Sequence, residues 1–184
     1  YKFVTSIISG TPVVNEPDLP ERENVLSESR DCEKIDLMFL VDTTGSMIKL
    51  IGDVRFYMAY IIDDLTQKYK DVRFAVSRFE DHPIYPYGEI MNIPYDLVHG
   101  FSYDTSYIEK VTAYLSPNYG GDLPESYAYA LRSASNETGW RDDAKRFIVL
   151  FADSEDRDDY SLREAINENN ALVLGIVKNP RYWR

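Results

Sequence analysis

Runs of apolar residues alternate along the chain with segments whose apolar positions recur every three or four residues. Nearly continuous apolar runs occupy residues 35–41, 146–152 and 171–177, and residues 72–79 predict a further strand with Phe74 and Val76 on one face. Runs of this length and composition are typical of strands that are buried on both faces. A shorter run at residues 97–101 predicts an edge strand within an otherwise irregular stretch.

The segment after the first of these runs has the pattern of an amphipathic helix. Its apolar positions are Met47, Leu50, Ile51, Val54, Met58, Ile61, Ile62 and Leu65. Their spacing places them on one helix face and predicts a helix that ends near residue 70. Ser106 and Glu109 form a capping box that predicts a second helix start, and Ser161 begins a similar one. With a further helix at residues 125–135, the alternation predicts an α/β fold, a doubly wound and mainly parallel sheet flanked by helices.

Proline and charge patterns divide the chain into two parts. Residues 1–33 contain several prolines followed by a charged run, which predicts an N-terminal extension or linker that could belong to a neighbouring domain. Residues 1–8 could also add an edge strand to the sheet. Residues 34–184 are expected to form the α/β domain. Because the alternation stops after the run at residues 171–177, we expect this domain to lack its last helix and strand.

The charge and composition of the chain exclude several classes of binding partner. The 184 residues carry a net charge of -11 with a pI near 4.6, which disfavours nucleic acid and anionic membranes and favours cations. No apolar run approaches the ~20 residues of a spanning helix, so direct membrane insertion is not expected. The single cysteine, Cys32, is either a lone thiol or half of a disulfide whose partner lies outside the chain. A glycosylation sequon at Asn136 fits a secreted context.

Oxygen-bearing side chains follow two of the predicted strands. Asp42, Thr44 and Ser46 come at alternate positions after the first strand, and Asp153 follows the strand at residues 146–152. The carboxyl ends of parallel strands meet at one edge of a sheet, so the two carboxylates should lie side by side if their strands are neighbours. A bound cation relieves their repulsion, and these oxygens suit Mg²⁺, Mn²⁺ or Ca²⁺.

At these residues the chain resembles the von Willebrand factor A (vWA) domain family. Asp42-Thr43-Thr44-Gly45-Ser46 is similar to the metal-ion-dependent adhesion site (MIDAS) of that family, and the segment at residues 120–125 and Asp153 match its remaining parts in order and spacing. The resemblance covers residues 35–184. It implies a vWA, Rossmann-like fold and a metal held, directly or through water, by Asp42, Thr44, Ser46, Glu125 and Asp153.

Two segments narrow the resemblance to the A-like (βI) domains of integrin β subunits. Residues 79–87 look like the corresponding loop of those domains, and residues 122–125 look like their Asp-x-Pro-Glu segment. This likeness implies a second, calcium-binding site formed by Asp81, Asp122, Glu125 and the Pro124 carbonyl.

Several departures from the integrin pattern limit that likeness. Ile48, Lys49 and Leu50 stand where integrin β domains have an acidic pair, so a third, adjacent metal site is not expected. Gly120 replaces the usual Asn of the second site, which puts the calcium there in doubt. The loop at residues 80–117 also lacks a disulfide. The chain is therefore expected to be a relative of that branch rather than an integrin subunit.

The resemblance implies a non-enzymatic adhesion or protein-binding module at the cell surface or outside the cell. An acidic side chain of a partner protein would complete the metal's coordination, and a neighbouring domain or subunit could contact the module. Tyr85, Tyr87 and Tyr119 could line the ligand-binding surface, because tyrosine is favoured in interface hot spots. Packing within a long loop would explain the same tyrosines.

Other interpretations of the same residues stay open at this point. Asp42 and Ser46 could be helix-capping residues, and Asp81 and Asp122 could be turn residues. His82 and His99 are expected in loops rather than at a metal. An intracellular vWA scaffold is an alternative function. A Mg²⁺-dependent phosphohydrolase is another, although Thr44 occupies the position at which the haloacid-dehalogenase-like enzymes have a second Asp.

Overall fold

The computed structural model describes residues 4–7, 33–83, 88, 90–117, 126–153, 164–165 and 171–177. Its strands are β1 (Val4–Ile7), β2 (Lys34–Asp42), β3 (Asp71–Phe79), β4 (Asp96–Ser102), β5 (Lys145–Ala152) and β6 (Leu172–Val177). Its helical elements are the 3-10 helix η2 (Gly45–Lys49) and the α-helices α1 (Ile51–Lys68), α2 (Thr105–Ala113) and α3 (Tyr127–Ser135). Within this part of the chain, no helix is long and apolar enough to cross a membrane.

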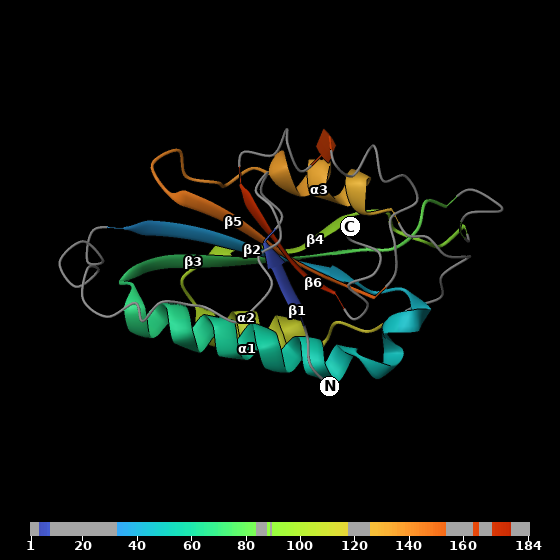
Figure 1. The fold of residues 1–184 in the computed structure, drawn as a ribbon, viewed down its shortest axis with the longest axis horizontal. Helices are drawn as coiled ribbons and strands as arrows, with labels where there is room; N and C mark the ends of the chain where they lie inside the picture. The colour runs from blue at the N-terminus through green and yellow to red at the C-terminus, as the bar shows by residue number, and fades with distance from the viewer. Residues whose placement is uncertain are drawn as a thin grey trace.

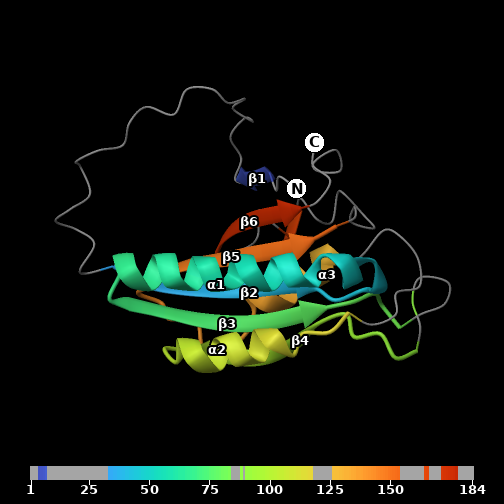
Figure 2. The same cartoon turned by 90° about the horizontal axis from the view of Figure 1, so that it is seen from below.

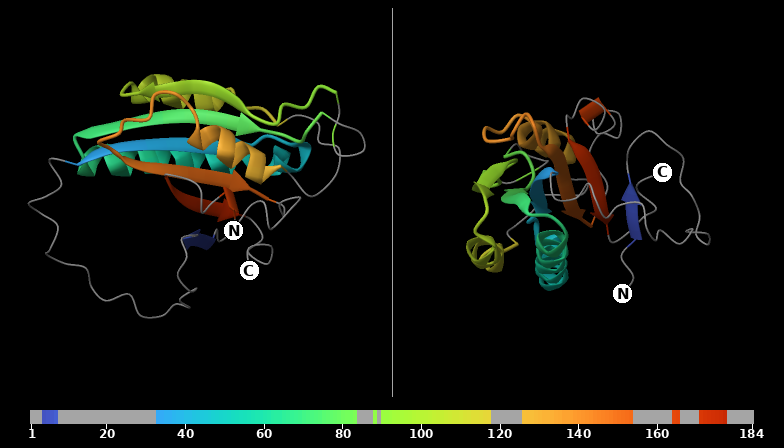
Figure 3. Two further views of the ribbon diagram at one scale, coloured as in Figure 1. Left: turned by 90° about the horizontal axis from the view of Figure 1, so that it is seen from above. Right: turned by 90° about the vertical axis from the view of Figure 1, so that its left-hand side faces the viewer.

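The strands form one sheet in the order β1-β6-β5-β2-β3-β4. The central pairs β2–β3, β2–β5 and β5–β6 are parallel, and the edge strands β4 and β1 are antiparallel to their neighbours. Helix α3 covers one face of the sheet, and α1 and α2 cover the other (Figures 1 and 3). The predicted mainly parallel α/β fold is therefore confirmed, together with both predicted edge strands.

Strand β2 lies at the centre and is buried along almost its whole length. Its odd-numbered residues from Ile35 to Val41 pack in the core on the side of α1, where the Phe39 and Phe74 rings stack with centroids 6.1 Å apart. Met38 and Leu40 belong to the core on the side of α3. A strand with two core faces has the continuous apolar run seen in the sequence.

Three helix starts differ from the predictions. Helix α2 is capped by Asp104, whose carboxylate accepts a 3.0 Å hydrogen bond from the Tyr107 amide, so Ser106 lies inside the first turn instead of capping it. Helix α1 begins at Ile51, because the residues just before it form the 3-10 helix η2. Helix α3 begins at Tyr127, two residues later than expected. The predicted cap at Ser161 lies outside the described residues.

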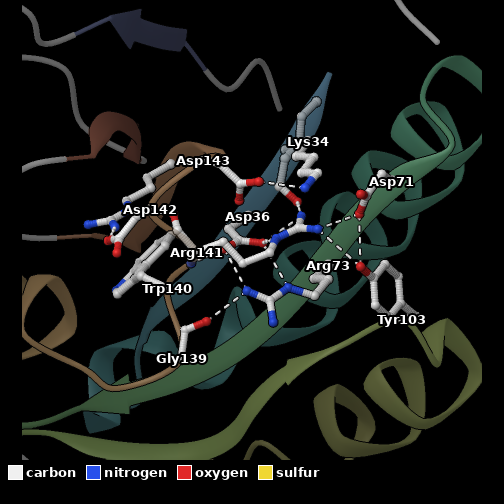
Figure 4. A network of polar contacts seen from close by, with 12 residues as sticks. Lys34, Asp36, Asp71, Arg73, Tyr103, Gly139, Trp140, Arg141, Asp142 and Asp143 are labelled. Carbon is white, nitrogen blue, oxygen red and sulfur yellow. Dashed lines mark hydrogen bonds and ion pairs between the residues drawn. The ribbon is translucent and has the colours of Figure 1, made fainter. Parts of the chain in front are cut away.

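A network of ion pairs holds the amino-terminal edge of the sheet (Figure 4). Asp36 is fully buried in β2, and its carboxylate accepts hydrogen bonds from the guanidinium groups of Arg73, at 2.7 and 2.9 Å, and Arg141, at 3.0 Å. Burial opposes ionisation of Asp36, but these bonds outweigh it and hold the pKa of the carboxyl below its usual value. Arg141 also bonds to Asp71 and Tyr103, so the network joins β2, β3 and the loop before β5.

Two aromatic side chains belong to strand β4 or pack against it. Trp140 packs against Phe101 with ring centroids 4.4 Å apart. His99 lies within strand β4 and not in a loop, so that part of the prediction is wrong. The apolar run at residues 97–101 predicts this strand, so the placement of His99 in a loop conflicts with the other prediction for the same segment.

Candidate metal centre

The carboxyl ends of the parallel strands meet at one edge of the sheet. Figure 2 shows β3, β5 and β6 pointing towards the same end of the molecule. Strand β2 ends at Asp42, and β5, its parallel neighbour, ends at Ala152, directly before Asp153. The strands that precede Asp42 and Asp153 are therefore neighbours, which is the condition under which the two carboxylates were predicted to lie side by side.

Asp42 organises the turn that leaves β2. Its Oδ1 accepts a 2.9 Å hydrogen bond from the Thr44 amide and a 2.7 Å hydrogen bond from the Thr44 hydroxyl. Both residues are buried. Thr44 is the N-cap residue of η2, and its side chain bonds to Asp42 rather than capping the helix. Neither Asp42 nor Ser46 therefore serves as the helix cap that the alternative interpretation assigned to them.

Hydroxyl groups connect Asp42 to the second carboxylate. The Thr44 Oγ1 lies 3.2 Å from the Ser46 Oγ, and the Ser46 hydroxyl donates a 2.9 Å hydrogen bond to Asp153 Oδ1. The structure thus brings Asp42, Thr44, Ser46 and Asp153 together in one continuous chain of polar contacts across the ends of β2 and β5.

The electrostatic environment of Asp42 disfavours its charge. Burial is the largest cause and raises the pKa of this carboxyl to about 7, although the hydrogen bonds from Thr44 act in the opposite direction. The charges of Asp153 and Asp81 contribute to the same rise of the pKa. Among the described residues, the Asp42 Oδ2 is a buried atom with no hydrogen-bond partner. A buried carboxylate oxygen without a partner is costly, and a cation would satisfy it.

A match to a family model shows which protein family has this fold and sequence. The model of the von Willebrand factor type A domain matches residues 36–174. The chain belongs to this family. A comparison with curated proteins gives no match.

Two solved structures show the same vWA fold. One is a von Willebrand factor type A protein from Catenulispora acidiphila, with a TM-score of 0.57 and 15% identity over 77% of this chain and 32% of that chain. The other contains three N-terminal domains of the type V pili tip protein Mfa5 from Porphyromonas gingivalis, with a TM-score of 0.51 and 16% identity over 65% of this chain and 20% of that chain. This vWA domain thus spans a third or less of either structure, and the likeness shows the fold alone.

The oxygen atoms at the carboxyl edge of this vWA domain fit a hard divalent cation. They come from two carboxylates and two hydroxyls, with one buried carboxylate oxygen left over. Carboxylate and hydroxyl oxygens are the donors that Mg²⁺ and Ca²⁺ prefer. Within the described ranges, no group of three or more histidine, cysteine, aspartate or glutamate side chains is arranged so that it could hold a metal ion. The predicted ligand Glu125 lies outside the described residues.

Of the residues predicted for a second, calcium-binding site, only Asp81 is described. Asp81 is fully buried in the loop after β3, and its charge acts on Asp42. This proximity was expected from the resemblance. Asp122, the Pro124 carbonyl and Glu125 lie outside the described residues, as do Tyr85, Tyr87 and Tyr119 of the predicted ligand-binding surface.

Sequence reasoning missed a buried clamp at the base of the loop after β3. Glu80 is 1% exposed, and its Oε2 accepts hydrogen bonds from the Asn92 side chain at 3.2 Å and from the Ile93 amide at 3.1 Å. Ile90 and Met91, just before the clamp, are 91% and 84% exposed. A glutamate in the middle of a polar loop gives no signal of burial, so only the fold reveals it.

Proposed function

We propose that this vWA domain is a metal-dependent protein-binding module. A divalent cation, Mg²⁺ or alternatively Mn²⁺ or Ca²⁺, would be held by Asp42, Thr44, Ser46, Glu125 and Asp153. The bound cation would supply an open coordination position for an acidic side chain of a partner protein. In this proposal the domain has no catalytic role, and its residues bind and orient the cation and the partner.

The observation that carries the proposal is the state of Asp42. Its Oδ1 is fixed by two hydrogen bonds from Thr44, and its buried Oδ2 has no partner among the described residues. The carboxyl is therefore fixed in orientation while its charge remains uncompensated. A structural aspartate at a strand end would have both oxygens hydrogen-bonded or exposed to water.

Adhesion at the cell surface or outside the cell is the setting that we propose for this binding. The similarity to a structure described as a pili tip protein supports it, as does the acidic composition, which favours cations. Two exposed apolar residues in the loop after β3, Ile90 and Met91, support a protein partner, because such side chains add contact area around a central anchor. As in integrin β domains, a second Ca²⁺ near Asp81 and Asp122 is part of the proposal.

Cation titration tests the metal centre directly. In isothermal titration calorimetry with Mg²⁺, Mn²⁺ and Ca²⁺, the native chain should bind at least one ion, and Asp42→Ala should abolish that binding. Asp142→Ala is the matched control, because this aspartate is exposed and pairs with Arg146 at the opposite edge of the sheet. A binding constant that is the same in Asp42→Ala and in the native chain would contradict the metal site. A second Ca²⁺ equivalent that is lost in Asp81→Ala would support the adjacent site.

A peptide library tests the partner chemistry. Phage-displayed random peptides would be selected on the immobilised domain in Mg²⁺ and eluted with EDTA. The enriched sequences should contain Asp or Glu, and they should not bind Asp42→Ala. Enrichment that survives EDTA, or sequences without an acidic residue, would refute recognition through the cation even if the metal binds.

A further inference from the structure

The residue that precedes helix α3 is a buried serine whose hydroxyl has no hydrogen-bond partner among the described residues. Ser126 is the N-cap residue of α3 and is 5% exposed. An N-cap serine normally accepts a hydrogen bond from an amide in the first turn of its helix. Here the Ser126 side chain makes no capping bond, and within the described part of the chain its Oγ has no partner.

Strand geometry places Asp42 on the face of the sheet that helix α3 covers. Side chains alternate along a strand, so Asp42 shares the face of Met38 and Leu40, which belong to the core beneath α3. Phe79, the partner of Asp42 in the adjacent strand, lies in the same core.

The start of helix α3 lies directly against this strand end. The Tyr127 ring packs edge-on against Phe79, with centroids 5.3 Å apart. The Thr43 amide and hydroxyl both donate to the Phe79 carbonyl, at 3.0 and 3.2 Å, which ties the same residue to the Asp42 turn. Ser126 precedes Tyr127 and therefore belongs to the end of α3 that is nearest the carboxyl edge of the sheet. Asp42 Oδ2 and Ser126 Oγ, two buried oxygens without hydrogen-bond partners among the described residues, thus lie at one edge and on one face.

We infer that Ser126 is a positioning residue of the metal centre, and that its hydroxyl bonds to a water of the cation's hydration shell. This inference rests on the proposed metal function. It assigns the unused hydroxyl to the hydrated ion and explains why this N-cap makes no capping bond. Groups that orient metal ligands or metal-bound water from outside the coordination sphere commonly tune metal affinity.

The Ser126→Ala variant tests the inference through two separate measurements. In EDTA its melting temperature should be equal to or slightly above that of the native chain, because no hydrogen bond is lost and a buried polar group is removed. In calorimetry its Mg²⁺ dissociation constant should rise about threefold to tenfold, the loss expected for one hydrogen bond. Ser133→Ala in the same helix is the matched control and should change neither value.

Each alternative gives a distinct result. A melting temperature that falls by several degrees in EDTA would assign Ser126 a structural role and overturn the inference. An unchanged Mg²⁺ dissociation constant would overturn it as well, since the hydroxyl would then take no part in binding. A native chain that binds no cation would refute the proposed function and this inference together, which is distinguishable from a defect confined to Ser126→Ala.

Discussion

Replacing Asp42 by Asn should stabilise the metal-free domain while removing its metal affinity. Asn keeps an oxygen that can accept both hydrogen bonds from Thr44, at the position of Asp42 Oδ1. Its amide nitrogen takes the place of the unpartnered Oδ2 and carries no charge. The substitution therefore removes a buried charge and its repulsion from Asp81 and Asp153 without disturbing the turn.

The size of the effect follows from the pKa of Asp42. Burial, aided by the neighbouring carboxylates, raises this pKa from 3.8 to about 7. One pKa unit corresponds to about 1.4 kcal/mol, so ionised Asp42 costs the folded metal-free domain about 4 kcal/mol at pH 8. The folded state binds the proton more tightly than the unfolded state. The cost is therefore absent below pH 4, grows between pH 4 and 7, and is complete above pH 7.

Urea unfolding in EDTA at several pH values measures this cost as a difference between two proteins. The free energy of unfolding of Asp42→Asn should exceed that of the native chain by about 4 kcal/mol at pH 8 and by little at pH 4. Groups that do not interact with Asp42 titrate alike in both proteins and cancel in the difference. Saturating Mg²⁺ should then stabilise the native chain, by about 2.7 kcal/mol at 100 times its dissociation constant, and leave Asp42→Asn unchanged.

Two results would refute the reasoning about Asp42. If Asp42→Asn is equally stable or less stable than the native chain at pH 8 in EDTA, the carboxylate is not held at a cost. A stability difference that does not vary with pH would show that the substitution acts through packing and not through charge. Asp142→Asn, at an exposed carboxylate, is the control and should follow the native pH profile.

Two further predictions concern regions away from Asp42. Arg141→Ala should lower the free energy of unfolding by about 3 kcal/mol in urea, because it removes one of the two guanidinium groups that pair with buried Asp36, while Mg²⁺ affinity should stay unchanged. Lys68→Ala, at an exposed ion pair with Asp64, is its control and should cost less than about 0.5 kcal/mol; equal effects would contradict the role of the network. Glu80→Ala should cost about 1–3 kcal/mol by leaving Asn92 and the Ile93 amide without their acceptor, and it should speed hydrogen exchange at residues 90–93. Unchanged exchange there would show that Glu80 does not hold the loop.

The sequence was sufficient to predict the sheet because its signal is physically simple. A parallel strand covered on both faces has an apolar side chain at almost every position, and β2 and β5 have this pattern. Helix starts were predicted less well. A capping box at Ser106 would bond the Glu109 amide, whereas Asp104 bonds the Tyr107 amide and starts the helix earlier, and tertiary packing selects between the two starts. Such local choices have similar energies, so the sequence alone does not decide them.

The candidate site was predictable where the chain is contiguous. Asp42, Thr44 and Ser46 lie within one turn, and the pairing of β2 with β5 brings Asp153 to them. The buried contacts of Glu80 and Ser126 could not be predicted. Their burial depends on elements far away in the sequence, and a lone glutamate or serine in a loop looks solvated. Asp36 gave a clearer signal, because a charged residue inside an apolar strand requires a partner, although the partners Arg73 and Arg141 lie in other elements.

The two aspartates of β2 show how the domain tolerates an uncompensated charge at its candidate site. Asp36 and Asp42 lie on the same face of one strand, at its opposite ends, and both are fully buried. Asp36 is paired with two arginines, and its pKa is lowered, so its ionised form stabilises the fold at neutral pH. Within the described part of the chain, Asp42 is hydrogen-bonded through one oxygen only, and its pKa is raised, so its ionised form destabilises the metal-free fold. The ion pairs of Asp36 stabilise the amino end of β2. The domain can therefore stay folded despite the free-energy cost of ionised Asp42 at the carboxyl end, until a cation binds. A domain in which Arg141→Ala has weakened the first end should consequently depend more on Mg²⁺ for its stability.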